Sequence, residues 1–114
     1  MKDFLFIYRM DYNNMPVGTP AEIQAMTQKW MDWIGTIAGK GKLGDRGNRL
    51  HNTGKTVKPG NVVTNGPYSD IKESIGGYTL VKADSYEEAV ALAKGCPALF
   101  AGGNVEVREI APLS

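Results

Sequence analysis

The pattern of apolar and polar positions predicts the order of the secondary-structure elements. Residues 4–8 (Phe-Leu-Phe-Ile-Tyr) are aromatic and β-branched, which is typical of a strand buried on both faces. Apolar runs at residues 62–64 and 78–83 predict two more strands, and the alternation over residues 104–110 predicts a last one. Residues 43–61 are rich in glycine and polar side chains, so we expect a loop there with one weak strand and a turn near its end.

Two capping patterns predict two helices. Thr19 precedes Pro20 and is followed three residues later by Glu22, and Ser85 is followed three residues later by Glu88. A Ser or Thr cap with an acidic residue at this spacing is typical of a helix start. Apolar residues then recur at helical spacing, at Ile23, Met26, Trp30, Trp33, Ile34 and Ile37 in the first helix and at Ala89, Val90, Leu92 and Ala93 in the second.

This order of elements predicts one α+β domain over residues 1–114, with a ferredoxin-like antiparallel sheet and two helices on one face. The other sheet face then has no helix to cover it. A partly apolar sheet face that is exposed usually contacts a partner. The simplest closure stacks the sheets of two copies face to face, so we expect a homodimer that forms an α+β barrel.

Residues 65–78 (Asn-Gly-Pro-Tyr-Ser-Asp-Ile-Lys-Glu-Ser-Ile-Gly-Gly-Tyr) carry a resemblance to a known family. They resemble the YCII-related proteins, and within these the branch named for its Asp-Gly-Pro-Phe (DGPF) motif. Asn65 stands for the Asp of that motif and Tyr68 for the Phe. The resemblance implies a small dimeric α+β barrel, a relative of barrels that include monooxygenase-like enzymes and stress-response proteins.

The founding branch of the family has a His on the first helix and an Asp before a Pro after the second, suggested as a catalytic pair. In this chain the two positions fall on Trp30 and Cys96, so we do not transfer that activity. Asn65 also lacks the carboxylate that a proton transfer at the motif would need. Trp30 is interpreted as a core residue. Cys96 follows a helix C-terminus, where the negative dipole end raises a thiol pKa, and is interpreted as a buried structural thiol.

Charge and composition narrow the range of partners. The formal net charge of +1 gives no global attraction to nucleic acid or to anionic lipid, so neither is an expected partner. Residues 40–58 carry a local charge of +5, but their glycines and turn residues favour a solvated loop over a phosphate contact. A single cysteine, no signal-peptide pattern and no membrane-spanning stretch lead us to expect the cytoplasm.

Alternation in the last strand indicates where a ligand could bind. If Val105 and Val107 pack under the helices, Glu106 and Arg108 face the barrel interior. Charges placed there must pair or meet a ligand, so they form either an intersubunit ion pair or a site in which Arg108 recognises an anion. We expect Lys72 to assist, together with either Tyr8 or Tyr78.

Other candidate chemistry is sparse. His51, the single histidine, is interpreted as a solvated loop residue or as a pocket residue, and without a second His or a Cys pair no metal site is predicted. Gly76-Gly77 precedes no Lys-Ser/Thr helix start, so it is read as a strand bend or a close backbone approach and no cofactor is predicted.

Three hypotheses for function remain, and no catalytic residue is assigned. The first is a module that binds or senses a small polar or anionic molecule. The second is a cofactor-free enzyme, monooxygenase-like or isomerase-like, that uses Tyr8, His51, Tyr78 or Arg108. The resemblance supplies the third, a partner of a transcription regulator, because relatives in the family are encoded beside sigma factors or fused to them. The absence of the His and Asp pair favours binding.

Overall fold

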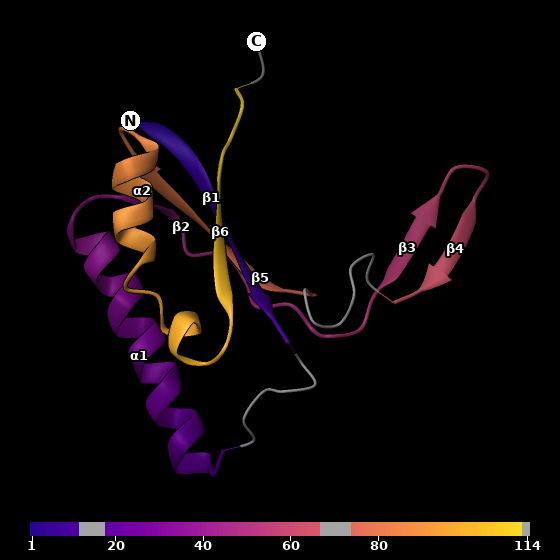
Figure 1. Ribbon diagram of the computed structural model, residues 1–114, viewed down its shortest axis with the longest axis horizontal. Helices are drawn as coiled ribbons and strands as arrows, with labels where there is room; N and C mark the ends of the chain where they lie inside the picture. The colour runs from indigo at the N-terminus through magenta and orange to yellow at the C-terminus, as the bar shows by residue number, and fades with distance from the viewer. Residues whose placement is uncertain (12–17, 67–73, 113–114) are drawn as a thin grey trace.

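Four antiparallel strands form the central sheet, in the order β2–β5–β1–β6. The structure, a computed structural model, describes residues 1–11, 18–66 and 74–112. The strands are β1 (Lys2–Met10), β2 (Leu43–Asp45), β5 (Ser74–Ala83) and β6 (Asn104–Glu109). Helices α1 (Pro20–Gly39) and α2 (Tyr86–Ala93) lie together on one face of this sheet (Figure 1). The predicted ferredoxin-like α+β arrangement is therefore confirmed.

The period of two along each strand separates a buried face from a second face without helices. On β1, Phe4, Phe6 and Tyr8 are buried under the helices, whereas Leu5 and Ile7 point to the other face and are only half-buried. The core continues through both helices and β5, and its other buried members are Trp33, Ile37, Val81, Ala83, Ala89, Ala93, Cys96 and Ala98. Val105 and Val107 of β6 pack against this cluster, as their alternation predicted.

Both predicted helix starts are confirmed. The Thr19 side chain accepts a hydrogen bond from the Glu22 backbone N–H at 3.2 Å. The Ser85 hydroxyl accepts one from the Glu88 backbone N–H, also at 3.2 Å. A short 3-10 helix, Pro97–Phe100, follows α2 and leads to β6.

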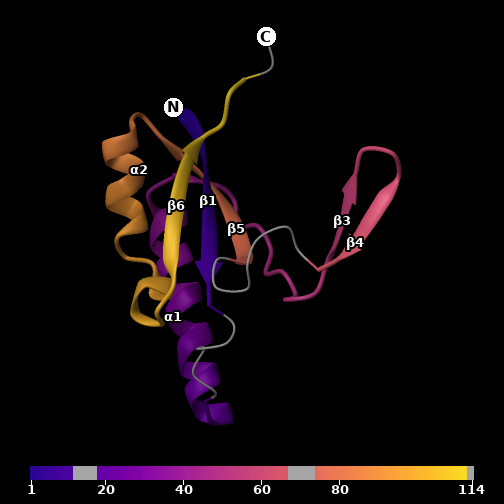
Figure 2. The same cartoon turned by 45° about the vertical axis from the view of Figure 1, so that its right-hand side comes forward.

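The apolar face predicted for α1 is buried only along its second half. Ile23 is 58% exposed, whereas Trp33 and Ile37 are buried. The cause is geometric, since the first turns of α1 extend past the end of the sheet and meet no strand (Figures 1 and 2).

Beyond β2 the chain continues beside β5 as an irregular edge. The Tyr78 N–H donates to the Asn48 carbonyl at 3.2 Å, and the Leu50 N–H donates to the Gly76 carbonyl at 2.8 Å. A Cβ on Gly77 would lie 2.8 Å from the Asn48 carbonyl oxygen, which is closer than real Cβ atoms approach. The Gly76-Gly77 pair therefore serves the predicted close approach between two backbones.

A separate two-stranded hairpin, β3 (Lys55–Lys58) with β4 (Val62–Asn65), interrupts the ferredoxin-like order. Gly60 and Asn61, with φ of 82° and 62°, form its turn, as the sequence predicted. We expected one weak strand before residue 62, and the structure has two, β2 and β3. We call residues 55–65 the β3–β4 arm. In two views 45° apart the arm stands away from the sheet, on the side opposite the helices (Figures 1 and 2).

Candidate functional site

The sheet face opposite the helices is uncovered by any element that the structure describes, and we call it the open face. Its apolar centre consists of residues that are only half-buried, namely Leu5, Ile7 and Leu80, together with the half-buried Tyr78. The strand register places Ile7 between Tyr78 of β5 and Glu106 of β6. Leu5 lies in the same way between Leu80 and Arg108. An apolar strip thus runs beside charged residues.

Glu106 lies between two arginines on this face. The Arg9 Nε donates to Glu106 Oε1 at 2.9 Å, and the Arg108 Nη1 donates to Oε2 at 3.2 Å. The hydrogen bond from Arg9, and then that from Arg108, holds the pKa of the Glu106 carboxyl below its usual value. The cluster thus joins two guanidinium groups to one carboxylate.

Arg108 is the member of this cluster that is presented to solvent. Its side chain is 67% exposed, twice the 33% of Glu106. A guanidinium carries five N–H donors, so one bond to Glu106 leaves donors of Arg108 for another acceptor. The sequence placed Glu106 and Arg108 together correctly, and the structure pairs them within one chain. Arg9 was missed, although it continues the alternation of Leu5 and Ile7.

Tyr78 lies on the open face across β1 from Glu106. Its hydroxyl accepts a hydrogen bond from Asn48 Nδ2 at 3.1 Å. Asn48 is held by the backbone pairing of the irregular edge with β5, so its amide is positioned by Gly47 and Gly77. No short sequence motif marks Asn48. The signal that the sequence did offer was Gly47 and Gly77, which permit the close approach of the two backbones here.

Tyr8 lies on the opposite side of the sheet, so the structure does not bring it together with Arg108. Its ring packs edge-on against Trp30 with centroids 4.8 Å apart, and its hydroxyl donates to Thr79 Oγ1 at 2.6 Å. Burial raises the pKa of the Tyr8 phenol well above its usual value. Of the two tyrosines expected as alternatives beside Arg108, Tyr8 is excluded, because it shares its strand phase with Phe4 and Phe6.

Two other candidates lie away from the charged cluster or outside the described residues. His51 is exposed in the loop between β2 and β3, next to Leu50, which pairs with the start of β5. Lys72 lies outside the described residues, as do Pro67 and Tyr68 of the motif. Within residues 1–11, 18–66 and 74–112 there is no group of three or more His, Cys, Asp or Glu residues that could hold a metal ion.

Cys96 is a fully buried thiol, as predicted. Burial raises the pKa of Cys96 to about 11, so the neutral thiol is the form present near neutral pH. Trp30 is only partly buried and packs at the edge of the core, whereas Trp33 is buried. Neither position that carries a catalytic residue in the founding branch therefore offers a reactive group to the open face.

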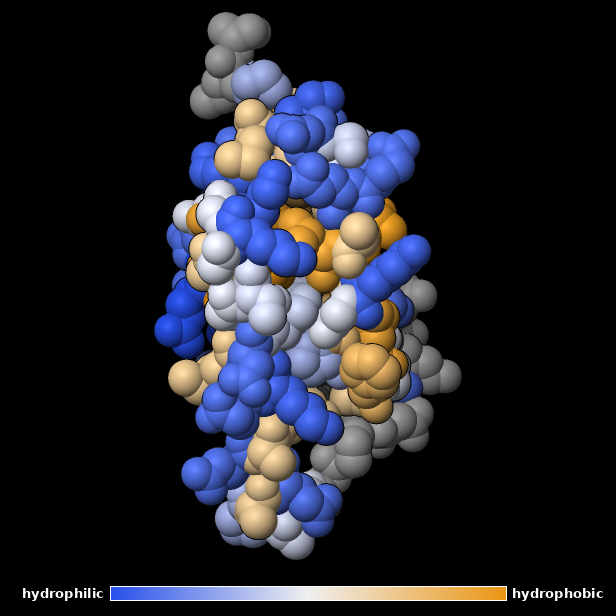
Figure 3. All heavy atoms as spheres, turned by 90° about the vertical axis from the view of Figure 1, so that its left-hand side faces the viewer, coloured by the Kyte–Doolittle hydropathy of each residue, from blue (hydrophilic) through white to orange (hydrophobic). Residues whose placement is uncertain are grey.

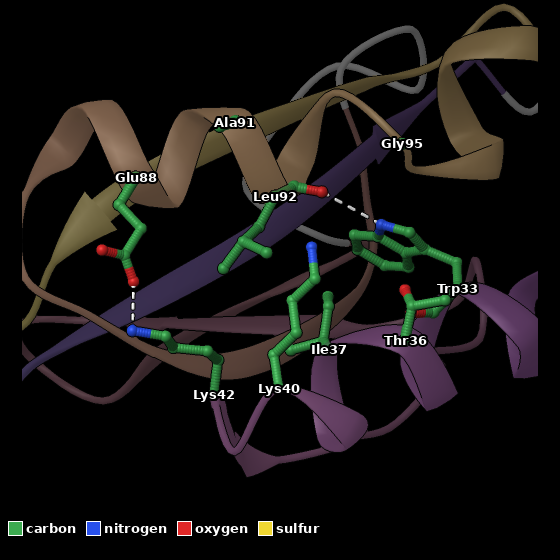
Figure 4. Close-up of a pocket in the computed structure, with 9 residues that line it drawn as sticks. All are labelled: Trp33, Thr36, Ile37, Lys40, Lys42, Glu88, Ala91, Leu92 and Gly95. Atoms are coloured by element: carbon green, nitrogen blue, oxygen red, sulfur yellow. Dashed lines mark hydrogen bonds and ion pairs between the residues drawn. The ribbon is translucent and has the colours of Figure 1, made fainter.

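A groove of about 460 Å³ lies on the helix side of the molecule, between α1 and α2 (Figure 4). Two of its charged groups pair with each other, with Lys42 Nζ 2.5 Å from Glu88 Oε1. The hydrogen bond between them raises the pKa of Lys42 and lowers that of Glu88. The Trp33 indole N–H donates to the Leu92 carbonyl at 3.0 Å across the same groove.

The Trp33 bond joins the two helices, and the Lys42–Glu88 pair connects α2 to the residue before β2, so we assign the groove a structural role. The surrounding helix side is mainly hydrophilic, with apolar side chains in small patches (Figure 3). No helix in the described part of the chain is long and apolar enough to cross a membrane.

Comparison with known proteins identifies the family. The chain is similar in structure to the 5-chloro-2-hydroxyhydroquinone dehydrochlorinase TftG of Burkholderia phenoliruptrix AC1100, solved in complex with 2,5-dihydroxybenzoquinone. The identity is 18% over 95% of this chain and 93% of that one, with a TM-score of 0.44. No curated protein sequence matches the chain. The model of the YCII-related domain matches residues 4–114, nearly the whole chain, which therefore belongs to the YCII-related family.

Proposed function

We propose that the protein binds a small polar or anionic molecule on its open face, inside the barrel that forms when the open faces of two copies stack. The observation that carries this proposal is the cluster of Arg9, Glu106 and Arg108 beside the uncovered apolar strip. The strip offers contact area to an apolar part of the ligand, and Arg108 offers donors to an anionic part.

The exposed guanidinium of Arg108 supports an anionic group in the ligand. Stacking two open faces removes water from both clusters, and a charge taken out of water must be paired. Within each cluster Arg108 keeps guanidinium donors beyond its one bond to Glu106, and these donors need an acceptor once water is removed. A carboxylate suits this position because a guanidinium binds it through two parallel hydrogen bonds.

Binding is proposed ahead of catalysis because the described residues present no activated acid or base on this face. Tyr8 keeps its proton in the core on the helix side. Tyr78 has its hydroxyl bonded to the amide of Asn48, which carries no titratable group.

We also propose a branch of the family and a cellular compartment for this protein. We propose the DGPF branch of the family on Asn65-Gly66, where β4 ends and Gly66 has a φ of 92°. We propose the cytoplasm as the compartment on the single buried Cys96.

The Arg108→Met variant tests the site. We expect it to stay folded, because Glu106 retains Arg9, and to lose affinity by about 2–5 kcal/mol, roughly 30-fold or more. A panel of small aliphatic and aromatic carboxylates and phosphates, screened by thermal shift, supplies the probe, and calorimetric titration then measures its affinity. Lys82→Met is the matched control, since Lys82 carries an open-face charge that pairs with Asp3 at 3.2 Å.

The alternative is that Arg108 only pairs with Glu106 and does not contact the ligand. In that case the double variant Arg108→Met with Glu106→Leu binds the probe as tightly as the wild type. Full affinity in the double variant, or equal losses in Lys82→Met and Arg108→Met, would contradict the proposed site.

A further inference from the structure

The β3–β4 arm exposes apolar side chains that the described part of its own chain does not cover. Val57, Val62 and Val63 are 72%, 51% and 55% exposed. The register pairs Val57 with Val63 across the two strands, so both valines lie on one face of the arm, and Val62 lies on the other face, opposite Lys58. A two-stranded hairpin is marginally stable at best in water without a further strand or a packed face. The arm therefore needs a surface to pack against.

The described residues leave two apolar surfaces on this side of the molecule without a covering element. They are the exposed valines of the arm and the half-buried apolar strip of the open face. Exposed apolar surface of this kind marks contact sites, and a standard protein interface buries about 800 Å² on each partner.

The direction in which the arm projects indicates which molecule it packs against. The arm stands on the open-face side of the sheet, away from the helices (Figures 1 and 2). Two sheets that stack face to face lie about 10 Å apart, so a second copy on the open face comes within reach of an arm that projects on that side. A two-fold axis makes the contact reciprocal, so that both arms and both open faces are covered at once. The net charge of +1 produces little repulsion between the copies.

We propose that the β3–β4 arm is a dimer clasp, in which the face that carries Val57 and Val63 packs on a second copy of this chain stacked on the open face. The clasp requires the dimer of the proposed function but no ligand. Experiments on dimer dissociation can therefore contradict the clasp without contradicting ligand binding, and the reverse also holds.

The double variant Val57→Thr with Val63→Thr tests the clasp. Threonine keeps the β-branched shape that strands favour and replaces a methyl group with a hydroxyl, so the hairpin itself is preserved. We expect the dimer dissociation constant, from sedimentation velocity over a dilution series, to rise about 10-fold or more. Val62→Thr on the opposite face of the arm is the matched control and should change it less than about 3-fold. An unchanged dissociation constant in the double variant overturns the clasp.

Hydrogen exchange of the wild-type protein gives a second readout that needs no substitution. We expect the amides of β3 and β4 to be protected at concentrations well above the dissociation constant, and to lose this protection below it, because an isolated hairpin opens readily. Equally fast exchange at both concentrations overturns the clasp, and so does a wild-type protein that stays monomeric. A double variant that dimerises normally while Arg108→Met loses the carboxylate probe removes the clasp and leaves the ligand site standing.

Discussion

Replacement of Trp33 with alanine is expected to lower the free energy of unfolding by about 3–5 kcal/mol. Trp33 is buried where α1 meets both the sheet and α2. Its ring stacks on Phe6 with centroids 6.2 Å apart, and its indole N–H reaches the Leu92 carbonyl of α2. The substitution removes a large apolar contact and a hydrogen bond to the half-buried Leu92, and each change destabilises the folded chain.

Urea unfolding of Trp33→Ala measures this loss. Trp30→Ala is the natural comparison, because Trp30 contacts Tyr8 and Trp33 but is only partly buried, so its cost should be smaller. A loss below about 1 kcal/mol for Trp33→Ala, or a larger loss for Trp30→Ala, would contradict this account of the core.

The Gly47→Ala variant is expected to be destabilised to a similar degree, by about 3–5 kcal/mol, for a different reason. Gly47 has a φ of +73°, and a Cβ there would collide with the carbonyl of Tyr78. The edge beside β5 would have to move, and Asn48 would move away from the Tyr78 hydroxyl. The variant should therefore lose stability and also weaken any ligand that contacts Tyr78.

Gly41→Ala separates strain from collision. Gly41 has nearly the same φ, +69°, but a Cβ there would meet no atom within 4 Å. Only the cost of the left-handed conformation remains, about 1–2 kcal/mol. Thermal and urea unfolding of both variants give the difference, and equal costs would show that the contact with Tyr78 is not tight.

Local chemistry made the sheet and its helices predictable from the sequence. The caps at Thr19 and Ser85 are short-range hydrogen bonds between neighbouring residues, so they can be read without the fold. The alternation of Val105 and Val107 with Glu106 and Arg108 assigned two sheet faces correctly, because a strand turns every second side chain the same way.

The parts that sequence could not predict depend on contacts between distant segments. An apolar run such as residues 4–8 does not reveal its phase, so Tyr8 was one of two tyrosines expected near Arg108 and lies instead with Phe6 under the helices. Asn48 reaches Tyr78 only because its segment pairs with β5, and the pairing of β1 with β6 decides that Arg9 lies beside Glu106. Ile23 is exposed because the sheet ends before it reaches the first turns of α1, and helical spacing alone does not show where a sheet ends.

The ligand site and the clasp both require that two copies of the chain contact each other through the open face. Sedimentation velocity of the wild-type protein at micromolar concentration tests it most directly. We expect one species of twice the 12.4 kDa chain mass, which dissociates on dilution. A single 12.4 kDa species at every concentration would contradict the account.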